Sequence, residues 1–149
     1  MTFLKELVTN PFLITPITAW FVAQVLKVII NLIVNKKLVW ERLVGDGGMP
    51  SGHSATVASL AMITGLLKGV GTFAFAIAAI LAIIVCHDAT GVRRETGRQA
   101  RVLNEIIEIL ESEKLPDAKL KELVGHTPLQ VAMGVLVGIC VAFAAYWLV

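Results

Sequence analysis

The residues best suited to chemistry lie in one short stretch, Gly-Asp-Gly-Gly-Met-Pro-Ser-Gly-His-Ser, at positions 45–54. Pro50 suits the first turn of a helix because it has no N–H and a fixed φ. Residues 51–54 would then occupy the opening turn, where unpaired backbone N–H groups and the positive end of the helix dipole favour an anion. His53 in that turn can donate a proton to a leaving oxygen. The alternative is a polar loop between helices with an N-cap serine.

A lysine inside an apolar segment is the second candidate. Lys27 shares one helical face with Gln24 and Asn31, which lie three residues before it and four residues after it. A charged side chain within a membrane span is costly and marks a pairing partner or a site. The alternative is that Lys27 extends its ammonium group to a nearby membrane interface. The alignment of three polar residues favours a site, and we expect Lys27 to bind phosphate.

Charged residues gather again where the third apolar segment ends, with Asp88 followed closely by Arg93 and Arg94. Guanidinium groups match the geometry of phosphate oxygens, so both arginines are candidate phosphate ligands. The alternative is a basic patch that attracts only anionic lipids. His87 beside Asp88 could indicate a metal, but adjacent residues on a helix point apart, so we expect no metal site.

Composition places the chain in a membrane. Of its 149 residues 56% are hydrophobic, and the mean hydropathy is +0.79, whereas about 45–50% apolar residues is typical of soluble domains. We expect one domain over residues 1–149, all-α, built as a polytopic helical bundle. Cys86 and Cys140 lie in separate apolar segments and are expected to be small core residues instead of a disulfide or metal pair.

The apolar segments predict about four transmembrane helices, over residues 11–35, 51–67, 72–90 and 126–149. The long polar segment before the last span predicts an amphipathic helix, on the membrane surface or against the bundle, and then a short helix over 117–124. Gly134 and Gly138 form a small-xxx-small pair where another helix can approach closely, which would also serve a homo-oligomer.

Loop charges predict the orientation. Lysine and arginine number three in residues 36–50 and seven in residues 91–125, and with four spans both segments lie on one side. The positive-inside rule makes that side cytoplasmic, in a multi-pass protein of the cell membrane. Every candidate group lies at this side, so a phosphate-binding site at the cytoplasmic face is expected.

Three segments resemble the type 2 phosphatidic acid phosphatase superfamily. Residues 49–54, Met-Pro-Ser-Gly-His-Ser, look like its second signature, and residues 126–138, a histidine followed by spaced glycines, look like its third. Residues 88–104 resemble the divergent branch of the superfamily, which comprises small membrane proteins of bacteria and plants. The resemblance covers roughly residues 20–140.

The resemblance implies a covalent mechanism without a metal or another cofactor. His126 would attack phosphorus, and His53 would protonate the leaving oxygen. Ser51 and the backbone of Gly52 would hold phosphate oxygens. These roles suit histidine, because a neutral imidazole is nucleophilic near pH 7 and a protonated imidazole is an acid.

The chain departs from the superfamily pattern at the first signature. That signature is a lysine, six further residues and then Arg-Pro, and no such string occurs in this sequence. We take Lys27 and Arg42 as its substitutes. The arginine of the third signature falls on Leu120, and Arg93 or Arg94 could replace it.

A further departure is at the position where the superfamily has an acid that orients the nucleophile. This chain has Gln130 there. Glutamine can accept an N–H bond but supplies no charge to an imidazolium. Asp88 could orient His126 in its place.

These features predict a membrane-embedded phosphatase that hydrolyses a lipid phosphomonoester or diphosphate through a phosphohistidine. Its partners would be the lipid phosphate and the membrane, with no nucleic acid, and a homo-oligomer would form through Gly134 and Gly138. One alternative is a non-catalytic protein that binds or transports phosphate lipids in the same pocket. Another is a small helical interaction partner.

Overall fold

The computed structural model describes residues 2–36, 48–110, 120 and 125–148, and the regular structure in this part of the chain is entirely helical. The prediction of an all-α bundle is confirmed. The helices of the described residues are α1 (Thr2–Thr9), α2 (Pro11–Asn35), α3 (Gly52–Lys68), α4 (Phe73–Thr90), α5 (Val92–Leu110) and α6 (Pro128–Tyr146). The expected short helix over 117–124 and the substitute Arg42 lie outside the described residues.

Three helical stretches of the described chain are long and apolar enough to cross a membrane, at Pro11–Asn35, Phe73–Ile109 and Pro128–Tyr146. The predicted number of four is therefore not confirmed. The difference lies in α3, whose 17 residues make a helix roughly 26 Å long, against a hydrocarbon core of about 30 Å.

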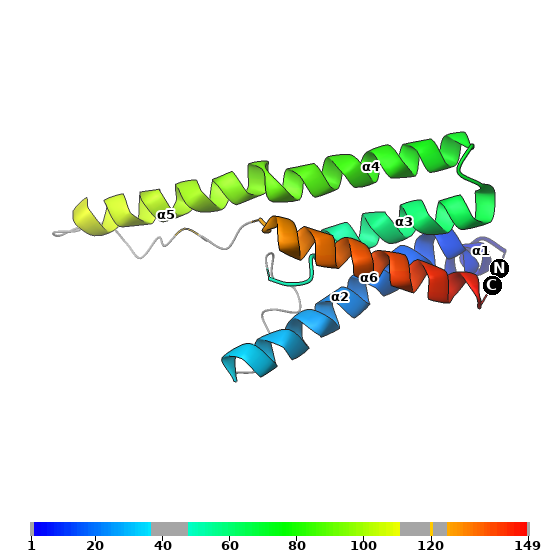
Figure 1. Cartoon of the computed structure of the whole chain (residues 1–149), viewed down its shortest axis with the longest axis horizontal. Coiled ribbons are helices and arrows are strands. Elements are labelled where there is room, and N and C mark those ends of the chain that lie inside the picture. The colour runs from blue at the N-terminus through cyan, green and yellow to red at the C-terminus, as the bar shows by residue number, and fades with distance from the viewer. Residues whose placement is uncertain (1, 37–47, 111–119, 121–124, 149) are drawn as a thin grey trace.

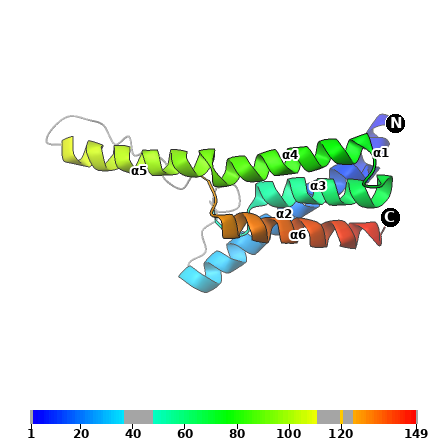
Figure 2. The same cartoon turned by 45° about the horizontal axis from the view of Figure 1, so that its top comes forward.

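The short helix α3 is the centre of the bundle, because α2, α4 and α6 all pack against it. Helices α3 and α6 run in the same direction, and both chain termini lie at the end of the bundle where these two helices finish (Figures 1 and 2). Small residues make this packing close: Ala19 and Ala23 of α2 and Ala55 of α3 are fully buried against one another. The starts of α3 and α6 thus lie together at the opposite end.

Glycines bring α6 onto α3. A Cβ atom at Gly134 would meet the carbonyl oxygen of Ser51, and one at Gly138 would meet the carbonyl oxygen of Ala55. The predicted close approach of a helix at these glycines is confirmed, and the helix is α3 of the same chain. A homo-oligomer through these two glycines stays a prediction, although each is already buried within one chain.

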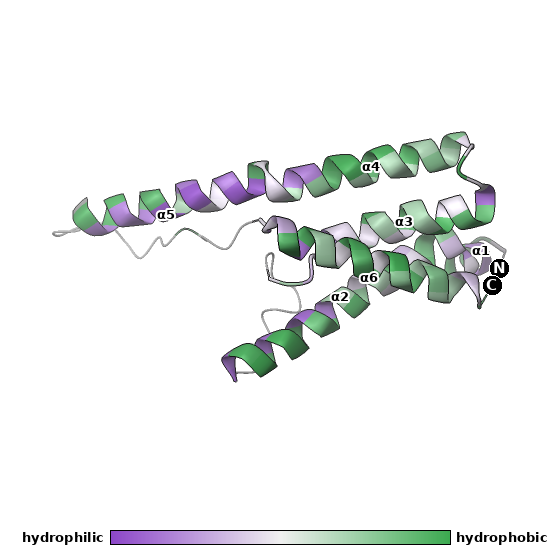
Figure 3. Ribbon diagram, in the orientation of Figure 1, coloured by the Kyte–Doolittle hydropathy of each residue, from purple (hydrophilic) through white to green (hydrophobic). Residues whose placement is uncertain are grey.

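Helix α5 continues in the direction of α4 and extends beyond the bundle (Figures 1 and 2), contacting no other helix of the described chain. The expectation that it packs against the bundle is wrong. The physical reason is its sequence: polar and apolar residues alternate along α5, whereas α4 is apolar over most of its length (Figure 3). A helix of that polarity gains less from entering an apolar bundle. Placement along a membrane surface stays a prediction.

Candidate active site

The first part of the site is the beginning of α3. Ser51 is its N-cap: Ser51 Oγ accepts hydrogen bonds from the Ser54 backbone N–H at 3.3 Å and from the Ser54 hydroxyl at 3.0 Å. The alternative of an N-cap serine is thus confirmed, and it places His53 in the first turn, as expected. Pro50 precedes the cap, so its predicted place inside the first turn is wrong, because the helix begins only at Gly52.

The second part is the beginning of α6. Thr127 and Gln130 form a capping box: Thr127 Oγ1 accepts the Gln130 N–H at 3.3 Å, and Gln130 Oε1 accepts the Thr127 N–H at 2.9 Å. His126 directly precedes this cap and is not itself the N-cap residue. The pattern Thr-x-x-Gln is a sequence signal for such a box, and it is sufficient to predict this one.

The two helix starts are joined, and their histidines meet. The Ser51 N–H donates to the Gln130 carbonyl oxygen at 3.0 Å, across the contact between α3 and α6. The rings of His53 and His126 have their centroids 5.9 Å apart and stand edge to face at 75°. The two imidazoles that the resemblance assigns to one reaction thus lie side by side, while their catalytic roles stay predictions. Two positive helix ends at this point favour an anion.

The end of α4 fixes His126 from a third direction. The His126 backbone N–H donates to the carbonyl oxygen of Ala89 at 2.9 Å, and His126 is only 3% exposed. Gly125 has a φ of +92° and lies against the chain at Arg93 and Arg94, where a Cβ would come within 2.6 Å of the Arg93 carbonyl carbon. No side chain larger than hydrogen fits there, so Gly125 determines where His126 lies.

Replacing Gly125 with alanine should displace His126 and lower the thermal unfolding temperature. The positive φ alone costs about 1–3 kcal/mol for a residue with a Cβ, and the collision with the Arg93–Arg94 backbone adds to it. Gly69→Ala is the matched control, since Gly69 has a φ of +93° with no atom within 4 Å of an added Cβ. Equal unfolding temperatures for the two variants would show that the close contact at Gly125 does not affect the stability of the protein.

Helix α2 packs against the first turn of α3. A Cβ at Gly52 would lie 3.3 Å from Trp20 Cδ1 and 3.7 Å from Gln24 Oε1. Lys27 follows Gln24 on the same face of α2 and is 4% exposed. This burial disfavours the alternative that Lys27 extends its ammonium group to a nearby membrane interface. Its contact with phosphate stays a prediction.

The candidate residues at the end of α4 pair with one another. Arg93 Nε lies 2.6 Å from Asp88 Oδ2, and both side chains are partly exposed. The Asp88 carboxylate thus stabilises the junction of α4 and α5, and the orientation of His126 by Asp88 stays a prediction. Arg94 is exposed at the same junction. Contact of either arginine with phosphate also stays a prediction.

Leu120, which stands at the arginine position of the superfamily's third signature, bonds through its backbone to the side chain of Asn104. Its N–H donates to Asn104 Oδ1 and its carbonyl oxygen accepts from Asn104 Nδ2, both at 2.9 Å. Leu120 is thereby bound to the side of α5. No group of three or more metal-ligating side chains occurs within the described residues.

A helical membrane protein with two histidines at the joined starts of two helices is the class that this fold and site define. The chain belongs to the divergent PAP2 family, whose model matches residues 8–141. It is 43% identical over 146 residues to the Bacillus subtilis (strain 168) protein called "Uncharacterized membrane protein YuiD", covering 90% of this chain and 92% of that relative. No solved structure matches the chain.

Proposed function

We propose that this protein is a membrane-embedded phosphatase that hydrolyses a lipid phosphomonoester or diphosphate through a phosphohistidine. The observation that carries the proposal is the histidine pair, with ring centroids 5.9 Å apart, in a chain of the divergent PAP2 family. At this separation both rings can reach atoms of one tetrahedral phosphate. Two helix N-termini beside them favour its negative charge.

The proposed reaction has two steps. A neutral His126 nitrogen attacks phosphorus, the bond from phosphorus to the leaving oxygen breaks, and His53 donates its proton to that oxygen. Water then attacks the phosphohistidine, His53 takes a proton from the water, and the phosphorus–nitrogen bond breaks to release inorganic phosphate. Both histidines return to their starting protonation states.

The groups that would hold the phosphate come from the start of α3, from α2 and from the start of α5. The Ser51 hydroxyl and the Gly52 N–H belong to the first residues of α3, and Lys27 is the buried cation on the neighbouring α2. Arg93 and Arg94 add positive charge at the start of α5, where Arg93 would exchange the Asp88 carboxylate for a phosphate oxygen. Fixed cations stabilise the charge of a phosphoryl transition state.

Two observations favour a second candidate, a protein that binds or transports phosphate lipids without hydrolysing them. The residue at the superfamily's acid position is Gln130, whose side-chain oxygen accepts the Thr127 N–H of the α6 cap. The Asp88 carboxylate, which could replace that acid, bonds to Arg93. An imidazolium without a carboxylate partner is less stabilised, which slows catalysis more than binding.

Phosphate release from a panel of lipid phosphates in proteoliposomes decides between the two candidates. The comparison is between the wild-type protein and the double variant His53→Ala/His126→Ala, each with a fluorescent phosphate-lipid analogue to follow translocation. Release above the level of the double variant supports the phosphatase. Equal release by both proteins ends that hypothesis, and translocation without release supports the second candidate.

We further propose that the site lies at the cytoplasmic face of the cell membrane. The arginines of α5 extend beyond the histidine end of the bundle, and the turn after α3 lies at the other end (Figure 1). In a chain whose Cys86 and Cys140 are replaced by alanine, a membrane-impermeant maleimide should label Gly71→Cys in whole cells. It should label Arg98→Cys only after the membranes are opened. The reverse pattern would place the site outside.

A further inference from the structure

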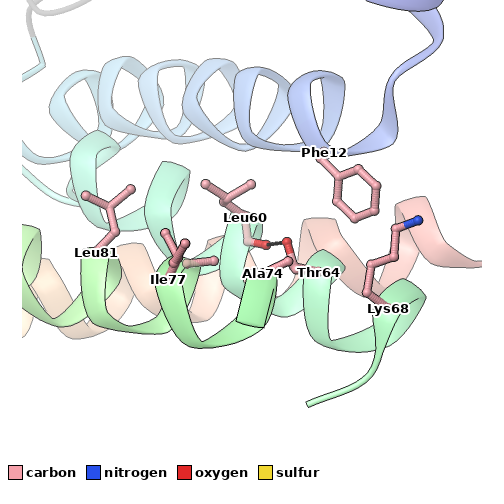
Figure 4. Close-up of a pocket in the computed structure, with 8 residues that line it drawn as sticks. Phe12, Leu60, Thr64, Lys68, Ala74, Ile77 and Leu81 are labelled. Carbon is pink, nitrogen blue, oxygen red and sulfur yellow. Dashed lines mark hydrogen bonds between the residues drawn. The ribbon is translucent and has the colours of Figure 1, made fainter. Parts of the chain in front are cut away.

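A cavity of about 430 Å³ lies between α2, α3 and α4, away from the histidines (Figure 4). Its volume is in the range of about 300–1,000 Å³ that is usual for ligand pockets. Each of the three helices contributes to its lining, with Phe12 from α2, Leu60, Thr64 and Lys68 from α3, and Ile77 and Leu81 from α4. It opens at the surface of the bundle where the membrane would surround these helices.

The walls of this cavity are suited to a hydrocarbon chain. Its lining is aliphatic or aromatic except at Thr64 and Lys68. The Thr64 hydroxyl donates to the Leu60 carbonyl oxygen at 2.7 Å, so its hydrogen is used within α3. A cavity without polar partners holds water poorly and is filled favourably by apolar groups.

One cation lies at the rim. Lys68 is the last residue of α3, is exposed, and has its Nζ 5.5 Å from the centroid of the Phe12 ring (Figure 4). A lysine near the end of a membrane helix extends its ammonium to the interface, where lipid phosphates lie. The cavity therefore combines an apolar interior with a positive charge at headgroup height.

We propose that this cavity binds one acyl chain of an anionic glycerophospholipid whose phosphate pairs with Lys68. The apolar interior of the cavity is complementary to the acyl chain of such a lipid, and the cation at its rim is complementary to the phosphate. Lys68 follows His53 by fifteen residues of the same helix, or roughly 22 Å, so this lipid is not the substrate at the histidine pair. The proposal does not depend on phosphatase activity.

Native mass spectrometry of the protein released from nanodiscs tests this proposal. The nanodiscs contain phosphatidylglycerol and phosphatidylcholine in equal amounts with matched acyl chains. We expect one phosphatidylglycerol to be retained in preference to phosphatidylcholine, and Lys68→Gln to lower that preference about fivefold. Ala74→Leu enlarges a side chain of the lining and so reduces the free volume of the cavity, which should lower the retention of both lipids.

Matched controls distinguish binding in this cavity from lipid retained elsewhere on the protein. Lys5→Gln removes a lysine from α1, which lies at the same end of the bundle, and Ala76→Leu enlarges an exposed residue of α4 outside the lining. Both should retain lipid as the wild type does. Unchanged preference in Lys68→Gln, unchanged retention in Ala74→Leu, or equal retention of the two lipids by the wild type would each overturn the proposal.

Discussion

Replacing His126 with asparagine is expected to abolish phosphate release, while His53→Asn lowers it by about 10²–10⁴-fold, as for the loss of a general acid. Without the His126 nitrogen no phosphohistidine can form, so no alternative group takes over the first step. The backbone at His126 is held by Ala89 and by the α6 cap, so asparagine should leave the local fold intact. Release is measured with the best lipid phosphate of the panel.

The leaving group separates the two roles. With p-nitrophenyl phosphate, whose leaving oxygen needs no proton, His53→Asn should lose far less activity in the first step, seen as a burst of p-nitrophenol, than it loses with a lipid phosphate, and His126→Asn should stay inactive. His87→Asn is the matched control, because His87 is an exposed histidine near the end of α4 that contacts His126. The assigned roles would be wrong if both variants lost the same activity on both substrates.

Substituting alanine for Gly134 or Gly138 should destabilise the protein by about 1–3 kcal/mol, seen as a fall of several degrees in the unfolding temperature in detergent. Glycine to alanine inside a helix normally stabilises by about 1 kcal/mol. Here the sign is reversed because the new Cβ meets the backbone of α3, at Ser51 for Gly134 and at Ala55 for Gly138, and backbone cannot rotate away.

Position along α6 predicts a further difference between the two variants. Gly134→Ala pushes against Ser51 and Ser54, next to His53, so it should lower phosphate release as well as stability. Gly138→Ala acts one turn further from the histidines and should affect mainly stability. Gly71→Ala, where an added Cβ meets no atom within 4 Å, is the control and should change neither. An unfolding temperature in either α6 variant as high as in this control would contradict the predicted packing.

Local patterns were sufficient for much of this protein. Long apolar runs predicted the three stretches that are long and apolar enough to cross a membrane, because a span depends on the composition of its own segment. Ser51 at the head of a helix placed His53 in the first turn, since a cap depends on a few neighbouring residues. The spacing of Gly134 and Gly138 indicated a close helix contact for the same local reason. The capping box at Thr127 has an equally local signal in the sequence.

Other features depend on contacts between distant segments. The direction of α5 depends on what its faces can pack against, and the pairing of Asp88 with Arg93 depends on the geometry at the α4–α5 junction. Neither follows from the spacing of residues along the chain. Resemblance to the superfamily could name Gln130 as the residue at the acid position, but it could not show that the Ser51 N–H donates to the Gln130 carbonyl oxygen.

The residue types at the site follow from the sequence alone: a histidine in the first turn of one helix and a second histidine just before another. Their meeting was decided by the tertiary structure. His53 and His126 are 73 residues apart and come together because α6 lies close enough to α3 for Ser51 to bond to Gln130. Gly125 then allows the returning chain to touch the start of α5. Such long-range contacts form only when several helices pack at once, so no local pattern can specify them.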